Sequence, residues 1–157
     1  MRAIEFVRQG TPVASNVQYC TTRPAPEPAP GEVLVRTLAS ALNHLDLWVG
    51  RGLPNIKVDW PTVSGSDGVG VVERVGAGVD AAWIGRRVVM NAAIMRAEPP
   101  TPHRAPAGED VWVIGEHGPG AHAELFVAPA TQVLDIGDTD PVQAAAFGLA
   151  HLTAWRM

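Results

Sequence analysis

The chain has 157 residues, enough for one domain with a hydrophobic core, and its composition of 46% hydrophobic and 18% charged residues excludes an intrinsically disordered protein. A net charge of −4 with scattered arginines argues against a nucleic-acid-binding protein. No run of residues is apolar enough to span a bilayer, the N-terminus lacks the apolar centre of a signal peptide, and the single Cys20 excludes an internal disulfide, so we expect a cytoplasmic protein.

The N-terminal third predicts strands and one short helix. Alternating residues indicate a strand over 3–7 and a possible second over 13–20, followed by a connector with four prolines. The alternation resumes in a strand over 32–40. A helix is expected over 43–50, because His44, Leu47 and Trp48 fall on one side at helical spacing, with Asn43 as its cap and Gly50 and Gly52 ending it.

The remainder predicts short strands separated by glycine turns, then a helix. Its expected strands cover residues 68–75, 87–90, 111–114 and 123–127. Residues 92–110 are rich in proline and alanine and indicate a long surface loop. A helix begins at residue 140, where Asp140 caps the chain and Pro141 suits the first turn.

Many short strands and few helices indicate a barrel or a sandwich, not a parallel sheet. Three Gly-x-Gly pairs bear on nucleotide binding: Gly68/Gly70, Gly76/Gly78 and Gly118/Gly120. None has a third glycine in register and none opens a helix, so we interpret all three as tight turns. The chain itself therefore carries no dinucleotide-binding fingerprint.

The stretch over 41–79 resembles the medium-chain dehydrogenase/reductase superfamily, which contains the zinc-type alcohol dehydrogenases and the quinone oxidoreductases. Its frame is present as Asn43 with Asp46, and as the segment 65–70, Gly-Ser-Asp-Gly-Val-Gly. The resemblance implies a mainly β, GroES-like, partly open β-barrel with short helices, the catalytic domain of such enzymes, over residues 1–157. Residues 140–157 then look like the start of the helix leading to a Rossmann domain that this chain lacks, so we expect a fragment of a longer enzyme.

The resemblance also predicts that no metal is bound. In the zinc-dependent members, cysteine, histidine and a second cysteine occupy the positions of Asn43, Ser66 and a residue near Leu149. A structural zinc would need four cysteines in the loop over 92–110, where there are none. Because zinc requires thiolate or imidazole at most positions, we predict a zinc-independent protein.

The candidate catalytic residues are Asn43, Asp46, Ser66 and Asp67. Asn43 is similar to the asparagine of zinc-independent quinone oxidoreductases and enoyl reductases, whose amide can orient a substrate carbonyl; a plain helix cap is an equal alternative. Asp46 and Asp67 match family carboxylates that orient their neighbours more than they catalyse.

The candidate cofactor-binding residues are Asn43, His44 and Thr153. By the resemblance, His44 faces the pyrophosphate of NAD(P)H and Thr153 touches the nicotinamide, while the missing domain binds most of the cofactor. Two structural alternatives remain open. His44 can be a partly exposed helix histidine, and the Thr153 hydroxyl can bond to its own helix turn.

The candidate substrate-pocket residues are Trp48, Ile94 and His117, although core packing is the commoner use of such side chains. A nearby group of acidic and histidine residues has no usual metal-ligand spacing, and we expect a surface role for it. It consists of Glu116, His117, His122 and Glu124.

These residues predict the catalytic domain of a zinc-independent NAD(P)-dependent oxidoreductase that reduces a quinone, an enone or another small activated carbonyl. The alternative is a stand-alone GroES-like binding or assembly module, and a zinc alcohol dehydrogenase is a weaker third. No nucleic-acid or membrane partner is expected. A homo-oligomer or association with a nucleotide-binding domain is possible, because the apolar segment over 144–155 suggests a surface that needs a partner.

Overall fold

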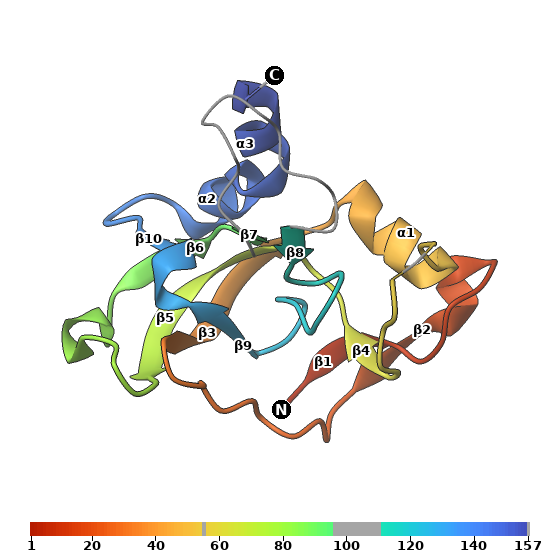
Figure 1. Ribbon diagram of the computed structural model, residues 1–157, viewed down its shortest axis with the longest axis horizontal. Coiled ribbons are helices and arrows are strands. Elements are labelled where there is room, and N and C mark those ends of the chain that lie inside the picture. The colour runs from red at the N-terminus through yellow and green to blue at the C-terminus, as the bar shows by residue number, and fades with distance from the viewer. Residues whose placement is uncertain (55, 96–110, 157) are drawn as a thin grey trace.

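The structure is a computed structural model that describes residues 1–54, 56–95 and 111–156, and its architecture is mainly β (Figure 1). The largest sheet has five strands in the order β10-β6-β5-β3-β9, all paired antiparallel. In chain order these strands are β3 (Glu32–Ala41), β5 (Asp67–Val75), β6 (Arg87–Met90), β9 (Leu125–Pro129) and β10 (Val133–Asp135). The strands predicted over 32–40, 68–75, 87–90 and 123–127 are therefore confirmed, with ends that agree within two residues, whereas β10 had no predicted counterpart.

Strand β5 lies so close to β3 that glycine is required on it. A Cβ on Gly70 would overlap the carbonyl oxygen of Arg36 on β3. At Gly68 a Cβ would instead overlap the side chains of Ala121 and Phe126. Both glycines lie within β5, so interpreting that pair as a tight turn was wrong, whereas the expected strand over 68–75 is correct. The turn follows at Gly76 and Gly78, where Gly78 has a φ of 81°.

Two smaller sheets complete the β structure. One has the order β2-β1-β4, formed by β1 (Ala3–Phe6), β2 (Val17–Cys20) and β4 (Thr62–Val63). The other pairs β7 (Ala93–Met95) with β8 (Val111–Val113). The expected second strand is correct only from Val17, because residues Val13–Asn16 form a 3-10 turn, η1. The expected loop over 92–110 contains β7 at its start, and residues 96–110 lie outside the described part.

The core lies on the inner side of the five-stranded sheet. Its buried members include Val33 and Val35 from β3, Val72 from β5 and Val88 from β6, together with Met90 and Phe126. Ile94, Trp112 and Val113 pack against this cluster from the two-stranded sheet. Because β-branched residues on one face of a pleated sheet pack well against each other, the alternation in the sequence specified this face.

Three α-helices lie in the described part: α1 (His44–Arg51), α2 (Pro141–Phe147) and α3 (Leu149–Arg156). The Asp140 side chain accepts hydrogen bonds from the amides of Val142 and Gln143, as its capping role predicts. Helix α1 includes Gly50 and is capped by Gly52, so only the second glycine ends it. Two short helices replace the single one expected from residue 140, because the helix is interrupted at Gly148.

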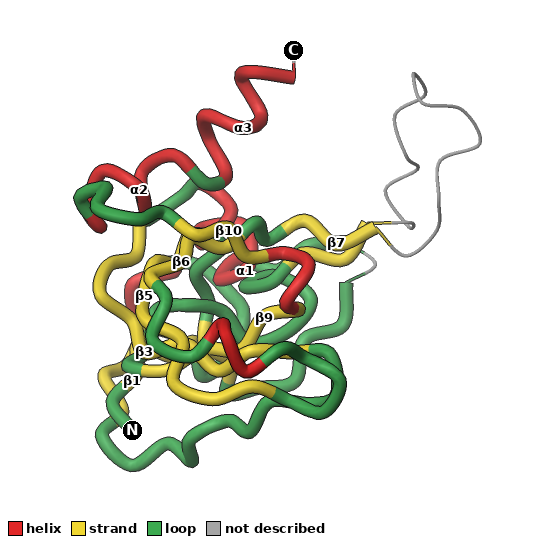
Figure 2. Tube along the Cα trace, turned by 90° about the vertical axis from the view of Figure 1, so that its left-hand side faces the viewer, coloured by secondary structure: helices red, strands yellow, loops and turns green. Residues whose placement is uncertain are grey.

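Helices α2 and α3 lie at one end of the molecule, whereas α1 lies at its side (Figure 1). Helix α2 packs against β3 and β5, and α3 projects away from the sheets, at the end opposite the N-terminus in both views (Figures 1 and 2). No helix in the described part of the chain is both long enough and apolar enough to cross a membrane.

Candidate functional site

A buried carboxylate, Asp67, connects three elements at the centre of the candidate site. It begins strand β5 and is 1% exposed. Its Oδ2 accepts a hydrogen bond from Asn43 Nδ2 at 2.8 Å, and its Oδ1 accepts one from the backbone N–H of Leu149 at 2.6 Å. The start of α1 and the start of α3 are thereby held to the same strand end.

The pKa of Asp67 is raised above its usual value. Burial is the main cause, and the negative charge of Asp46 adds to it. The hydrogen bonds from Asn43 and Leu149, and the electrostatic interaction with His122, act in the opposite direction. Asn43 and Leu149 are therefore the two donors that offset part of the cost of burying this carboxyl group.

Asn43 occupies the N-cap position of α1 with an extended backbone. Its own N–H donates to Asp46 Oδ2 at 2.7 Å, and the N–H of Asp46 donates to the Asn43 carbonyl at 3.1 Å. Burial acts most strongly on the pKa of Asp46 and raises it, but contacts with His122 and with the Asn43 backbone outweigh burial and lower this pKa overall. The cap position leaves the Asn43 side chain directed to Asp67, so capping and a site role are compatible.

The hydroxyl of Ser66 forms its hydrogen bond with the backbone of another segment and not with Asn43. Its side chain is buried, and its hydroxyl donates to the carbonyl of Ile114 at 2.9 Å. The amide of Asn43 likewise presents N–H hydrogens to Asp67. Within residues 1–54, 56–95 and 111–155, whose side chains are described, no group of three or more His, Cys, Asp or Glu residues is arranged to hold a metal ion. These donor groups do not fit a zinc ion.

The predicted cofactor-binding residues lie on two helices. His44 is exposed in the first turn of α1, with its ring centroid 6.3 Å from that of Trp48. Thr153 is exposed on α3, and its hydroxyl donates to the carbonyl of Leu149 at 2.7 Å, the internal helix bond that was the structural alternative. Asn43 connects both helices through Asp67.

The predicted substrate-pocket residues lie on three separate segments. Trp48 on α1 is 49% exposed, and Ile94 on β7 packs partly buried against the core. His117 follows β8, where its Nδ1 accepts the N–H of Val113 at 3.1 Å. Burial raises the pKa of the neighbouring Glu116 carboxyl, with His117 opposing this effect.

An apolar groove of about 400 Å³ runs between the sheet and the last two helices. Met90 and Asn91 line it from the sheet, and Phe147, Gly148 and Leu152 line it from the helices. Gly148 also adjoins the site, because a Cβ there would overlap Asp67 Oδ1. The groove therefore approaches Asp67 through Gly148, and none of the predicted substrate-pocket residues is among those that line it.

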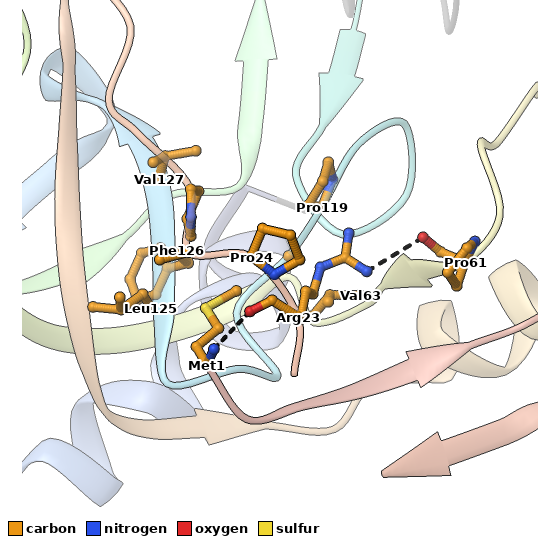
Figure 3. A pocket seen from close by; sticks show the side chains of 12 residues that line it. Met1, Arg23, Pro24, Pro61, Val63, Pro119, Leu125, Phe126 and Val127 are labelled. Carbon is orange, nitrogen blue, oxygen red and sulfur yellow. Dashed lines mark hydrogen bonds between the residues drawn. The ribbon is translucent and has the colours of Figure 1, made fainter. Parts of the chain in front are cut away.

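A second pocket, of about 450 Å³, lies near the N-terminus and is seen in Figure 3. Proline side chains line much of it, and the Arg23 guanidinium donates to the Pro61 carbonyl at 3.3 Å at its edge (Figure 3). None of the predicted site residues is among those that line this pocket.

His122 is the residue that the sequence reading placed wrongly. Its expected group does not form one cluster: Glu124 pairs with Arg2 at the surface, whereas the His122 side chain is buried and faces Asp46. The signal in the sequence was weak. Small residues surround His122 in Gly-Ala-His-Ala, and Gly65 leaves room for its ring, since a Cβ there would lie 2.8 Å from it.

Comparison with known proteins places this arrangement in context. Residues 29–138 match the family model described as the alcohol dehydrogenase GroES-like domain. The chain is 32% identical over 137 residues to an alcohol dehydrogenase of Geobacillus stearothermophilus, covering 80% of this chain and 38% of that protein. It is 27% identical over 157 residues to the quinone oxidoreductase of Rattus norvegicus, covering 99% of this chain and 40% of that protein.

A solved structure of an NAD-dependent alcohol dehydrogenase superposes on the whole chain with a TM-score of 0.82 at 38% identity, and 46% of that protein is covered. The chain therefore spans less than half the length of each of these relatives. The superposition confirms the predicted fold class, a GroES-like, mainly β domain, and the described strands do not close into a complete barrel.

Proposed function

Because the chain belongs to the alcohol dehydrogenase GroES-like domain family, within the medium-chain dehydrogenase/reductase superfamily, we propose that it is the substrate-side domain of a zinc-independent NAD(P)-dependent oxidoreductase. Its substrate is a quinone, an enone or another small activated carbonyl. The reaction is hydride transfer between the nicotinamide and this substrate. Residues 1–157 form the catalytic domain, and the Rossmann domain that binds most of the cofactor is supplied outside these residues.

The Asn43–Asp67 hydrogen bond is the observation that carries this proposal. In the zinc-dependent relatives a thiolate would stand at position 43 and an imidazole at position 66. Here an amide donates to a buried carboxylate, and a buried hydroxyl donates to a backbone carbonyl. Amide and hydroxyl groups are poor zinc ligands. The Asn43 amide keeps a second N–H hydrogen that can orient a carbonyl group, whereas the single hydroxyl hydrogen of Ser66 is already donated to Ile114.

The chain's own residues suit the nicotinamide cofactor in a supporting role. Asn43, His44 and Thr153 would contact it, and the cofactor itself would supply the hydride when bound. Asp67 fixes Asn43 and the start of α3 relative to each other, so the three candidate contacts share one anchor. Holding a donor and an acceptor in a fixed geometry is the main contribution a protein makes to such a transfer.

Reduction of a quinone or an enone fits the site better than oxidation of an alcohol. Alcohol oxidation needs a metal or a base to remove the hydroxyl proton, and neither Asn43 nor Ser66 supplies one. The apolar groove beside Gly148 would keep water from the hydride path. The proton that completes the reduction then comes from solvent or from the other domain.

The exposed surface of α2 and α3 bears on the alternative function, a stand-alone binding or assembly module. Phe147, Leu152 and Trp155 are 60%, 45% and 87% exposed. Apolar side chains gathered in this way tend to need a partner. We favour a nucleotide-binding domain as that partner, and a module that works alone would need a more polar face here.

The first test is the intact mass of the protein purified from its source, compared with its reading frame. We expect both to continue beyond Met157 into a strand, Gly-x-Gly-x-x-Gly and a helix. The purified protein should oxidise NADH or NADPH with a quinone or an enone, and a chelator should leave the rate unchanged.

A matched pair of variants then tests the site. Asn43→Ala should lower kcat about 100-fold, the scale of losing one well-placed donor, whereas Leu42→Ala, at the neighbouring position that is 83% exposed, should leave kcat unchanged. A natural stop at Met157 with no nucleotide binding would instead support the stand-alone module. A rate that is lost when the chelator is added would instead support the hypothesis of a zinc-dependent alcohol dehydrogenase.

A further inference from the structure

His122 and Asp46 form a buried pair that the proposed reaction does not use. Their side chains are 6% and 7% exposed, and His122 Nε2 lies 3.4 Å from Asp46 Oδ1. Among the described residues, neither of these two atoms has a hydrogen-bond partner, so their mutual contact is the polar contact that each makes. On the other side of the ring, His122 Nδ1 lies 3.0 Å from the Ser40 hydroxyl.

The cost of burial explains why these two atoms face each other. A buried polar atom without a partner is expensive, and the closeness of these two atoms lets each offset that cost for the other. If the ring proton is on Nε2, it points to the carboxylate, and Nδ1 accepts from Ser40. With the proton on Nδ1, a nitrogen lone pair would face the carboxylate oxygen, which is repulsive.

The pair connects directly to the candidate site. Asp46 uses its second oxygen to accept the Asn43 N–H at 2.7 Å, and the Asn43 side chain donates to Asp67 at 2.8 Å. His122 therefore acts on Asn43 through Asp46. The backbone N–H of His122 donates to the Ser64 carbonyl at 3.0 Å, which fixes the backbone at this position. Gly65 leaves space for the imidazole ring, because a Cβ there would lie 2.8 Å from it.

We propose that His122 is a positioning residue that carries its proton on Nε2, holds the Asp46 carboxylate, and thereby fixes the N-terminus of α1 and the Asn43 amide against Asp67. The effect of this positioning on hydride transfer rests on the proposed function. The positioning itself does not, and it can be measured without a cofactor.

The first experiment uses the unaltered 157-residue chain, so it does not depend on any variant folding. Long-range ¹H–¹⁵N correlation spectra of its histidines, in mildly alkaline buffer, report which ring nitrogen carries the proton. We expect His122 in the Nε2–H form. The Nδ1–H form would overturn the proposal, because Nε2 would then have no hydrogen to give to Asp46.

The second experiment compares two amide variants of different reach. In His122→Gln the longer side chain places an N–H donor near the Nε2 position, whereas in His122→Asn the donor reaches only the Nδ1 position. The exchange rate of the Asn43 amide hydrogen should rise about tenfold in His122→Asn and stay within about twofold of the unaltered rate in His122→Gln. Ser40→Ala is the control, since it leaves the Asp46 contact in place.

Unchanged exchange in His122→Asn would overturn the proposal, as would equal increases in both variants, because both results mean that Asp46 is held without a donor at Nε2. A readout in the active protein separates this inference from the proposed function. His122→Asn should lower kcat about tenfold and His122→Gln should restore it. An inactive parent protein that still shows the Nε2–H form and the exchange difference would reject the proposed function alone.

Discussion

The carboxylate of Asp67 accepts the backbone N–H of Leu149 at 2.6 Å, across 82 positions of the chain. A single buried side chain thus anchors the start of α3. Its other oxygen accepts from Asn43, so the anchor of α3 and the partner of the candidate carbonyl-orienting amide are the same group. A substitution that disturbs Asn43 should therefore also affect the start of α3, and a change at the start of α3 should affect Asn43.

Asn43→Ala should lower the free energy of unfolding by about 1–3 kcal/mol, because it leaves the buried Asp67 carboxyl group without one of its two hydrogen-bond donors. Urea denaturation of the variant and the parent chain measures this difference. Leu42→Ala, at an 83% exposed position, is the control and should change stability by less than about 0.5 kcal/mol. Equal effects of both substitutions would mean that the Asn43 amide contributes nothing to holding Asp67.

The pH dependence of stability should separate Asp67 from Asp46. The pKa of Asp67 is raised in the folded state, mainly by burial, so its contribution is fully present below the ordinary aspartate pKa and is lost as pH rises through the raised value. Relative to Asp67→Asn, the parent chain should therefore lose stability with rising pH. Urea midpoints measured across a pH series check this prediction.

Asp46 should show the opposite sign. Burial raises its pKa, but His122 and the Asn43 backbone outweigh burial and lower the pKa overall. Its contribution is present above the ordinary aspartate pKa and is lost as pH falls through the lowered value. Relative to Asp46→Asn, the parent chain should lose stability as pH falls. Parallel curves for the two variants would contradict both assignments.

Gly148→Ala should destabilise the junction of α2 and α3 by about 1–3 kcal/mol, because the added methyl group overlaps Asp67 Oδ1. The backbone at Gly148 has a φ of −55°, so alanine meets no conformational penalty there. A double-mutant cycle with Asp67→Ala isolates the overlap. In the Asp67→Ala background, the cost of Gly148→Ala should fall by at least about 1 kcal/mol, and an additive pair would exclude a direct contact.

Metal content provides a further check on the site. We expect the purified chain to contain much less than one equivalent of zinc, since Ser66 donates its hydroxyl to Ile114 and Asn43 donates its amide to Asp67. Adding a chelator should leave its Tm unchanged, as measured by circular dichroism. One equivalent of zinc, together with a lower Tm after chelation, would show that the donor set has been interpreted wrongly.

The sequence by itself determined the local structure. Alternating valines specified β3 and β5, and Asp140 followed by Pro141 specified the start of α2, because such signals act within a few residues. The family motifs that contain Asn43 and Ser66 could also be recognised in the sequence, since they depend on residue type and spacing. The identification of the family followed from those motifs and is confirmed by the match over residues 29–138.

Only the tertiary structure decided which polar groups meet. Asp46 could not be paired with His122, nor Asp67 with Leu149, from any local pattern, because these partners lie on separate strands and helices. Their distances depend on strand register and on the break at Gly148, which turned one expected helix into two. Burial then makes these contacts matter, since a buried carboxylate or imidazole must find a partner within the fold and has no water to replace it.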